Sequence, residues 1–124
     1  MPDKIKSPES KSLGSINISP QAIALVAGIA ALQCFGVVGM ASRTLQDGIS
    51  ELITGKDNLA KGIEVDIDGD RVIVGLYIIV EYGVRIKEVA YNVIENVKYA
   101  IENQLGLQTL KVNVMVQGVR IDKK

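Results

Sequence analysis

The chain has 124 residues, of which 48% are hydrophobic, and this length and composition indicate one folded domain rather than a disordered protein. Its 14 basic and 14 acidic residues cancel, and this balance argues against nucleic acid as the main partner, because phosphate binding needs a basic surface. A single cysteine excludes an intramolecular disulfide, and the N-terminus lacks the apolar run of a signal peptide, so we expect an intracellular protein.

The N-terminal segment is polar, so residues 1–13 are predicted to be a disordered tail, followed by one domain at 14–122 and a tail at 123–124. Residues 15–18 are predicted as a short edge strand. Ser19 and Pro20 have the pattern of a helix start, with the serine as the N-cap and the proline at the first helical position. A helix is therefore predicted over residues 20–33.

The uncharged run over residues 22–41 is long enough to be weighed as a membrane span. It is rich in Ala and Gly rather than Leu and Ile, and its glycines divide it into a helix and a strand, so we predict no span and a strand at 35–40. Cys34, at their junction, is predicted to be a small buried residue, because the chain has no histidine to activate it.

The second half of the chain alternates between strand and helix patterns. A helix is predicted at 42–54, and the alternation of apolar and acidic residues at 63–68 predicts a strand whose Asp68-Gly69 pair turns into a second strand at 71–81. An amphipathic helix is predicted from Val84 to Leu105, with Gly106 as its cap, and a strand at 110–116. The buried stripe of this amphipathic helix should consist of Ile86, Ala90, Val93, Val97, Ile101 and Leu105.

These elements predict an α+β fold, with a small mixed sheet, helices, and the element order β-α-β-α-β-β-α-β. A ferredoxin-like core and a KH-like core both remain open. The strand at 71–81 is apolar on both faces, which is typical of a strand that is central in its sheet or covered by a partner. One face carries Val72, Val74, Leu76, Ile78 and Val80, and the other carries Ile73, Tyr77 and Ile79.

No pattern in the chain indicates catalysis. The acidic run at 64–70 partly matches a calcium loop, but Gly75 stands where the closing acid is needed, so we interpret the run as a solvated strand edge and turn. Residues 36–39 have the Gly-x-x-Gly spacing of a KH loop, but a Val-Val middle favours close backbone packing. No catalytic, cofactor-binding or metal-binding residue is predicted. Rim or interface positions are predicted for Tyr77, Tyr82, Tyr91 and Tyr99.

Five segments, in this order along residues 14–122, carry a family resemblance: INISPQAIALVAGIAA, FGVVGMA, GIEVDIDGDRVIVGLYIIVEYGVRIKEVA, IENQLGL and VNVMVQGV. Together they resemble the alkaline-shock-protein family of envelope-stress proteins from Gram-positive bacteria. The form Cys-Phe-Gly-Val-Val-Gly-Met at 34–40 favours a housekeeping branch of it. The resemblance implies a cytoplasmic, non-enzymatic protein of cell-envelope homeostasis, which self-associates and is held near the membrane by an anchoring partner.

Two hypotheses about function follow. In the first, the protein is a self-associating scaffold under the membrane, and contact between copies buries Ile73, Tyr77 and Ile79. In the second, it is a regulatory module that binds an apolar small molecule or a metabolic enzyme between its sheet and its helices. A scaffold should present an apolar patch on its exterior, whereas a ligand-binding module should enclose an apolar pocket.

Overall fold

The computed structural model describes residues 15–41, 52–53, 62–69 and 71–121. The predicted tails, residues 56–61 and most of the predicted helix at 42–54 lie outside these ranges. In chain order, the elements are α2 (Pro20–Leu32), β1 (Val37–Ala41), β2 (Leu52–Ile53), β3 (Ile63–Asp68), β4 (Arg71–Glu81), α3 (Ile86–Ala100), a π-helical turn (Ile101–Leu105) and β5 (Gln108–Arg120).

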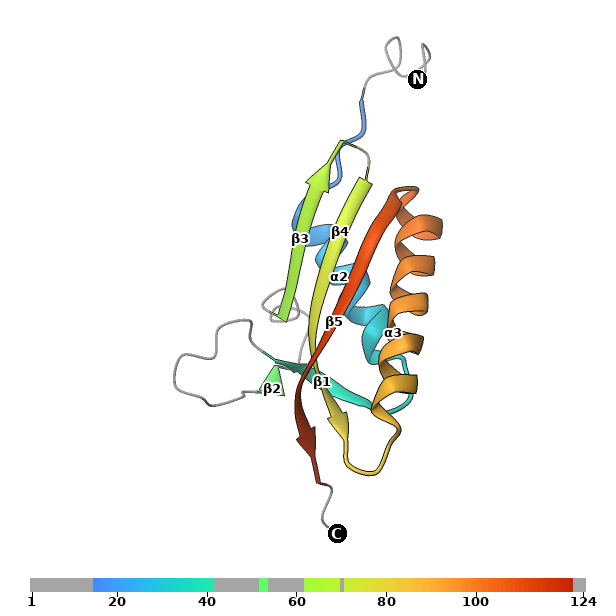
Figure 1. Cartoon of the computed structure of the whole chain (residues 1–124). Coiled ribbons are helices and arrows are strands. Elements are labelled where there is room, and N and C mark those ends of the chain that lie inside the picture. Colours follow the sequence, from blue (N-terminus) through green and yellow to red (C-terminus); the bar gives the residue numbers. More distant parts are fainter. Residues whose placement is uncertain (1–14, 42–51, 54–61, 70, 122–124) are drawn as a thin grey trace.

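The five strands form one mixed sheet around β4, which confirms the predicted α+β class (Figure 1). One edge of β4 pairs in parallel with β5 along its whole length. The other edge pairs in antiparallel fashion first with β3 and then, beyond Leu76, with β1, which in turn pairs with β2. Because β4 and β5 are direct neighbours, no strand lies between the two parallel strands, and the ferredoxin-like alternative is wrong.

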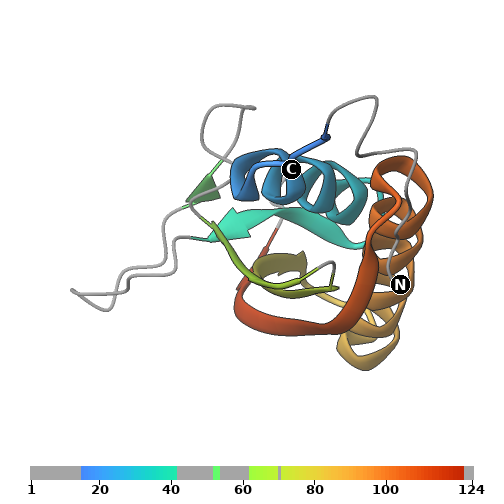
Figure 2. The same ribbon diagram turned by 90° about the horizontal axis from the view of Figure 1, so that it is seen from above.

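Both helices lie on the same side of the twisted sheet, next to each other (Figures 1 and 2). The sheet side chains that face them are the predicted inward row of β4, and all five are fully buried. Opposite this row, α2 contributes Ile23 and small residues such as Ala27, and α3 contributes its apolar stripe. The largest side chains with no exposed surface in this core are Ile23, Met40, Val72, Val74, Leu76, Ile78, Val80, Val93, Val97 and Ile101.

The helix ends follow the local signals in the sequence. The Ser19 side chain accepts a hydrogen bond from the Ala22 backbone N–H at 3.1 Å, and Pro20 is the first helical residue, as predicted. At the other end of the chain, Gly106 ends the π-helical turn in a left-handed conformation, with φ of 71°. The hairpin between β3 and β4 turns at Gly69, whose φ is 68°.

Several boundaries differ from the sequence prediction. Residues 15–18 are not in a strand, and the Ile16 side chain is almost fully exposed, so its alternation with polar residues has no covered face. Leu52 and Ile53 are in β2 rather than in a helix, because pairing with β1 overrides the local helical spacing. Ile86 is 42% exposed, since it is the first residue of α3, and the buried stripe begins at Val89.

The segment at 36–39 belongs to the start of β1 rather than to a KH loop. Gly36 has φ of +91°, and a Cβ at this position would lie 2.9 Å from Val89 Cγ2. The Gly36 carbonyl also accepts a hydrogen bond from the Glu81 N–H at 2.8 Å. The glycine therefore allows the turn before β1 to approach α3 closely, which is the close-packing interpretation.

Candidate functional site

The sheet face opposite the helices is covered by no other described element, and we call it the open face (Figures 1 and 2). Its composition follows from strand register, because paired residues on neighbouring strands point to the same side. Register aligns Glu64 and Asp66 with Gly75 and Ile73, and it aligns the β5 residues with the same row. The open face thus consists of Glu64, Asp66, Asp68, Arg71, Ile73, Gly75, Tyr77, Lys111, Asn113 and Met115.

The predicted interface residues do not all lie in the same environment. Ile73 and Tyr77 are half-buried on the open face, where a partner could still cover them. Ile79, in contrast, is only 6% exposed within the single chain, next to register shifts in the pairing of β4 with both β1 and β5. Met115 lies beside Tyr77 and is 52% exposed. The accessible apolar surface is therefore formed by Ile73, Tyr77 and Met115.

Charged side chains flank this apolar strip with opposite signs. Asp66 on β3, Ile73 on β4 and Lys111 on β5 are in register, so the acid and the amine lie on either side of the isoleucine. Asp66 and Lys111 are both exposed, and within the described ranges of the chain neither makes an ion pair. The open face is thus acidic along β3 and basic at Lys111 and at Arg71, which pairs in register with Asp68.

A shallow hollow of about 340 Å³ lies in the middle of the open face. The hollow lies at Gly75, because this residue places no side chain between those of Ile73 and Tyr77. A Cβ at Gly75 would have Glu64 Oε1 as its nearest neighbour, at 3.6 Å, which is an ordinary van der Waals distance. Its lining residues are Glu64, Val65, Asp66, Ile73, Gly75 and Asn113. The predicted solvated acids therefore lie along an exposed strand beside this hollow, separated by two-residue steps, which is the geometry of a strand edge rather than of a calcium loop.

A second hollow, of about 270 Å³, lies between α2 and α3. Asn96 joins the two helices at its base, because its Nδ2 donates to the Ala30 carbonyl and contacts Cys34 Sγ, both at 3.4 Å. Cys34 is buried, as predicted, and burial raises the pKa of its thiol, while the hydrogen bond from Asn96 acts in the opposite direction. The described residues that line it are all uncharged: Val26, Ile29, Ala30, Gln33, Asn96, Tyr99, Ala100 and Gln104.

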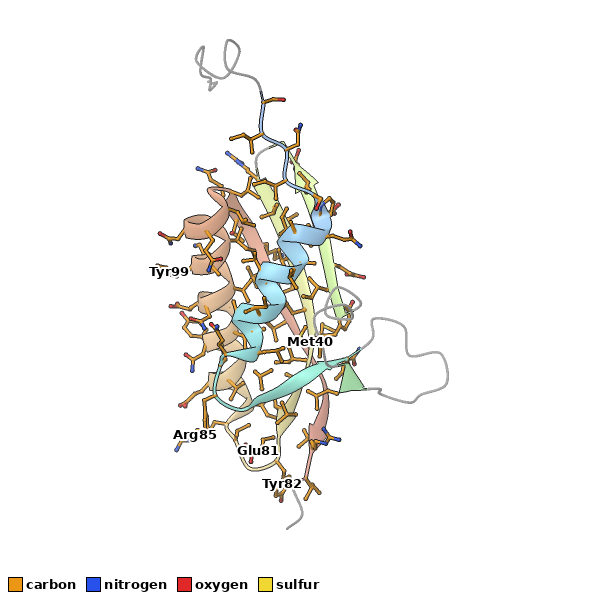
Figure 3. All side chains as sticks on the ribbon, turned by 180° about the vertical axis from the view of Figure 1, so that it is seen from behind. Met40, Glu81, Tyr82, Arg85 and Tyr99 are labelled. Carbon is orange, nitrogen blue, oxygen red and sulfur yellow. The ribbon has the colours of Figure 1, made fainter. Side chains whose placement is uncertain are left out.

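Aromatic side chains are exposed elsewhere on the surface. Figure 3 shows Tyr99 on the outer side of α3 and Tyr82 at the end of the molecule where α3 begins. Both are more than half exposed, and so is Tyr91, in agreement with rim positions. Phe35 was predicted to begin a strand, but it lies in the turn before β1 and is 80% exposed. Sequence periodicity could not show this exposure, because it depends on the turn that Gly36 makes.

No helix among the described residues is long and apolar enough to cross a membrane. Residues 8–121 match the alkaline shock protein family, whose function is related to the cell envelope. The chain belongs to this family.

Relatives of this alkaline shock family member occur in Gram-positive bacteria. YloU of Bacillus subtilis is 46% identical over 109 residues, which cover 87% of this chain and 90% of YloU. Spy1614 of Streptococcus pyogenes is 42% identical over 109 residues, which cover 87% of this chain and 89% of Spy1614. Among solved structures, a zinc form of the MamM CTD aligns with a TM-score of 0.48 and 13% identity over 84% of this chain and 87% of that one.

Proposed function

We propose that this alkaline shock family member is a non-enzymatic protein of cell-envelope homeostasis, which self-associates through its open face and is held near the cytoplasmic membrane by a partner protein. Membership of a family whose function is related to the cell envelope supports this proposal. The observation that carries the proposal is the apolar strip of Ile73, Tyr77 and Met115 on a sheet face that no described element covers. Apolar strips on exposed sheet faces are typical of surfaces that another protein covers.

Two further features support association between copies. The formal net charge is zero, so long-range repulsion between identical chains is small. The open face also lies on the central strand of the sheet, so its side chains are held in a fixed arrangement before any partner arrives.

The alternative function is a regulatory module that binds an apolar small molecule or a metabolic enzyme. One observation favours it: the hollow between α2 and α3 is lined by uncharged described residues, and among these Gln33, Asn96 and Gln104 could orient a ligand. The space between sheet and helices, in contrast, is filled by fully buried core side chains such as Leu76, Val93 and Ile23. Any ligand would thus bind in the hollow between α2 and α3 rather than inside the core.

Self-association is tested by light scattering on the purified protein over a concentration series, compared with the variant Met115→Glu. Met115 is half exposed on the open face, so a charge there should leave the single chain folded but should oppose its burial in a contact. We expect the wild type to gain mass with concentration and Met115→Glu to remain a monomer at concentrations about tenfold higher or more. Tyr99→Glu is the matched control, because Tyr99 is similarly exposed on α3.

The outcomes separate the two functions. A wild-type oligomer that Met115→Glu dissociates and Tyr99→Glu does not would support the scaffold. A wild type that remains a monomer at every concentration would overturn the scaffold and favour the regulatory module, and equal loss of mass in both variants would overturn the open face as the contact.

A further inference from the structure

The open face has a charge order that determines how two copies can meet. Across the sheet, from β3 through β4 to β5, one row reads Asp66, Ile73, Lys111. Neighbouring strands are about 4.8 Å apart, so the backbone positions of Asp66 and Lys111 lie roughly 10 Å from each other, on opposite sides of Ile73. Within the part of the chain that the structure describes, neither side chain makes an ion pair, which leaves both charges available to a partner.

Two identical sheets that pack face to face can be related by a two-fold axis in either of two main directions. An axis perpendicular to the strands places β3 of one copy over β3 of the other. The acids Glu64, Asp66 and Asp68, which project from the same side of β3, would then face the same acids of the second copy. Like charges in direct opposition destabilise a contact, so this arrangement is disfavoured.

An axis parallel to the strands gives the opposite result. It places β3 of one copy over β5 of the other, while β4 lies over β4 and the apolar side chains of Ile73 meet near the axis. Arg71, at the exposed end of β4, also lies near the axis, where Asp68 of its own chain is its neighbour in the register. Because Asp66, Ile73 and Lys111 lie in one row, Asp66 of each copy then faces Lys111 of the other. The symmetry produces this acid–base pair twice. Packed sheets lie about 10 Å apart, a distance that the long lysine side chain can span.

We propose that the open face binds a second copy of this chain through a two-fold axis parallel to β4, with two symmetry-related Asp66–Lys111 ion pairs on either side of an apolar strip made by Ile73, Tyr77 and Met115. This proposal rests on the proposed self-association and specifies its geometry. The hollow at Gly75 lies next to Ile73 and leaves space for side chains of the second copy to enter the contact.

The geometry is tested by exchanging the charges on separate chains. Asp66→Lys alone places two lysines opposite each other, and Lys111→Glu alone places two acids opposite each other, so each single variant should weaken dimerisation about tenfold or more. A one-to-one mixture of these two variants restores an acid opposite a lysine at both pairs. We therefore expect the mixture to form heterodimers with a dissociation constant within about threefold of the wild-type value.

The measurement is analytical ultracentrifugation of each variant alone and of the mixture, with circular dichroism to confirm that each chain is folded. Glu95→Lys is the matched control for Asp66→Lys, because it changes net charge equally at an exposed position of α3. It should leave the dissociation constant unchanged. If either charge reversal fails to fold, Asp66→Asn and Lys111→Gln replace it, and the loss from the second substitution should then be small once the first is present.

Each outcome bears on one proposal or on both. Recovery of the dimer only in the mixture would support the parallel axis. A mixture no stronger than the single variants, or an Asp66→Lys variant that associates as well as the wild type, would overturn this geometry while leaving self-association intact. A wild-type protein that shows no association would overturn both.

Discussion

The close approach at Gly36 gives the sharpest prediction about stability. Substitution by alanine has two costs: the backbone has φ of +91°, which disfavours residues with a side chain by about 1–2 kcal/mol, and the new Cβ would lie 2.9 Å from Val89 Cγ2 and 3.3 Å from Val84 Cγ1. Overpacking of this kind costs about 1–3 kcal/mol. Gly36→Ala should therefore lower the free energy of unfolding by about 2–5 kcal/mol.

Gly83→Ala is the matched control for the steric part of this cost. Gly83 has nearly the same φ, +97°, but a Cβ there would meet no atom of the described residues within 4 Å, so only the backbone cost of about 1–2 kcal/mol applies. Both variants should be measured by urea denaturation at one protein concentration. Equal losses in the two variants would show that α3 does not press against this turn, and the close-packing explanation would then be wrong.

Two further predictions concern the helix start and the thiol. Ser19→Ala removes the acceptor of the Ala22 N–H and should lower the free energy of unfolding by about 1 kcal/mol in urea denaturation, whereas Ser19→Gly should cost only a few tenths. Because burial raises the pKa of Cys34 above its ordinary value of 9.0, its contribution to stability is complete below that pH and is lost as pH rises toward the higher folded-state pKa. Between pH 8 and 11, the free energy of unfolding should thus fall less steeply with pH in Cys34→Ala than in the wild type, by up to about 1.4 kcal/mol per pH unit. If the two proteins lose stability in parallel, burial does not raise the pKa of Cys34.

Local patterns in the sequence predicted the elements whose structure depends on near neighbours. The inward row of β4, the N-cap at Ser19 and the stop at Gly106 were confirmed, because each follows from a spacing or a backbone preference within a few residues. The class of fold and the family were also confirmed, since they rest on the order of many such elements.

Features that depend on contacts distant in sequence were missed. The row of Asp66, Ile73 and Lys111 is formed by three strands and by a shift in the pairing of β5 at Ile73, neither of which periodicity reveals. The burial of Ile79 likewise coincides with irregular pairing at that position, so its alternation with Tyr77 suggested more exposure than the fold allows. The predicted contact through Ile73 and Tyr77 therefore remains a prediction, and in the structure Met115 rather than Ile79 is the exposed apolar neighbour of Tyr77.

The position of β4 has a consequence for the kinetics of any association. Both of its edges are hydrogen-bonded, one by β5 and the other by β3 and β1 in turn, so the backbone that carries Ile73 and Tyr77 cannot move without breaking the sheet. A second copy that binds there meets a surface that needs no prior ordering, and the loss of conformational entropy is confined to side chains. Its association rate should then be set by encounter and orientation rather than by a folding step.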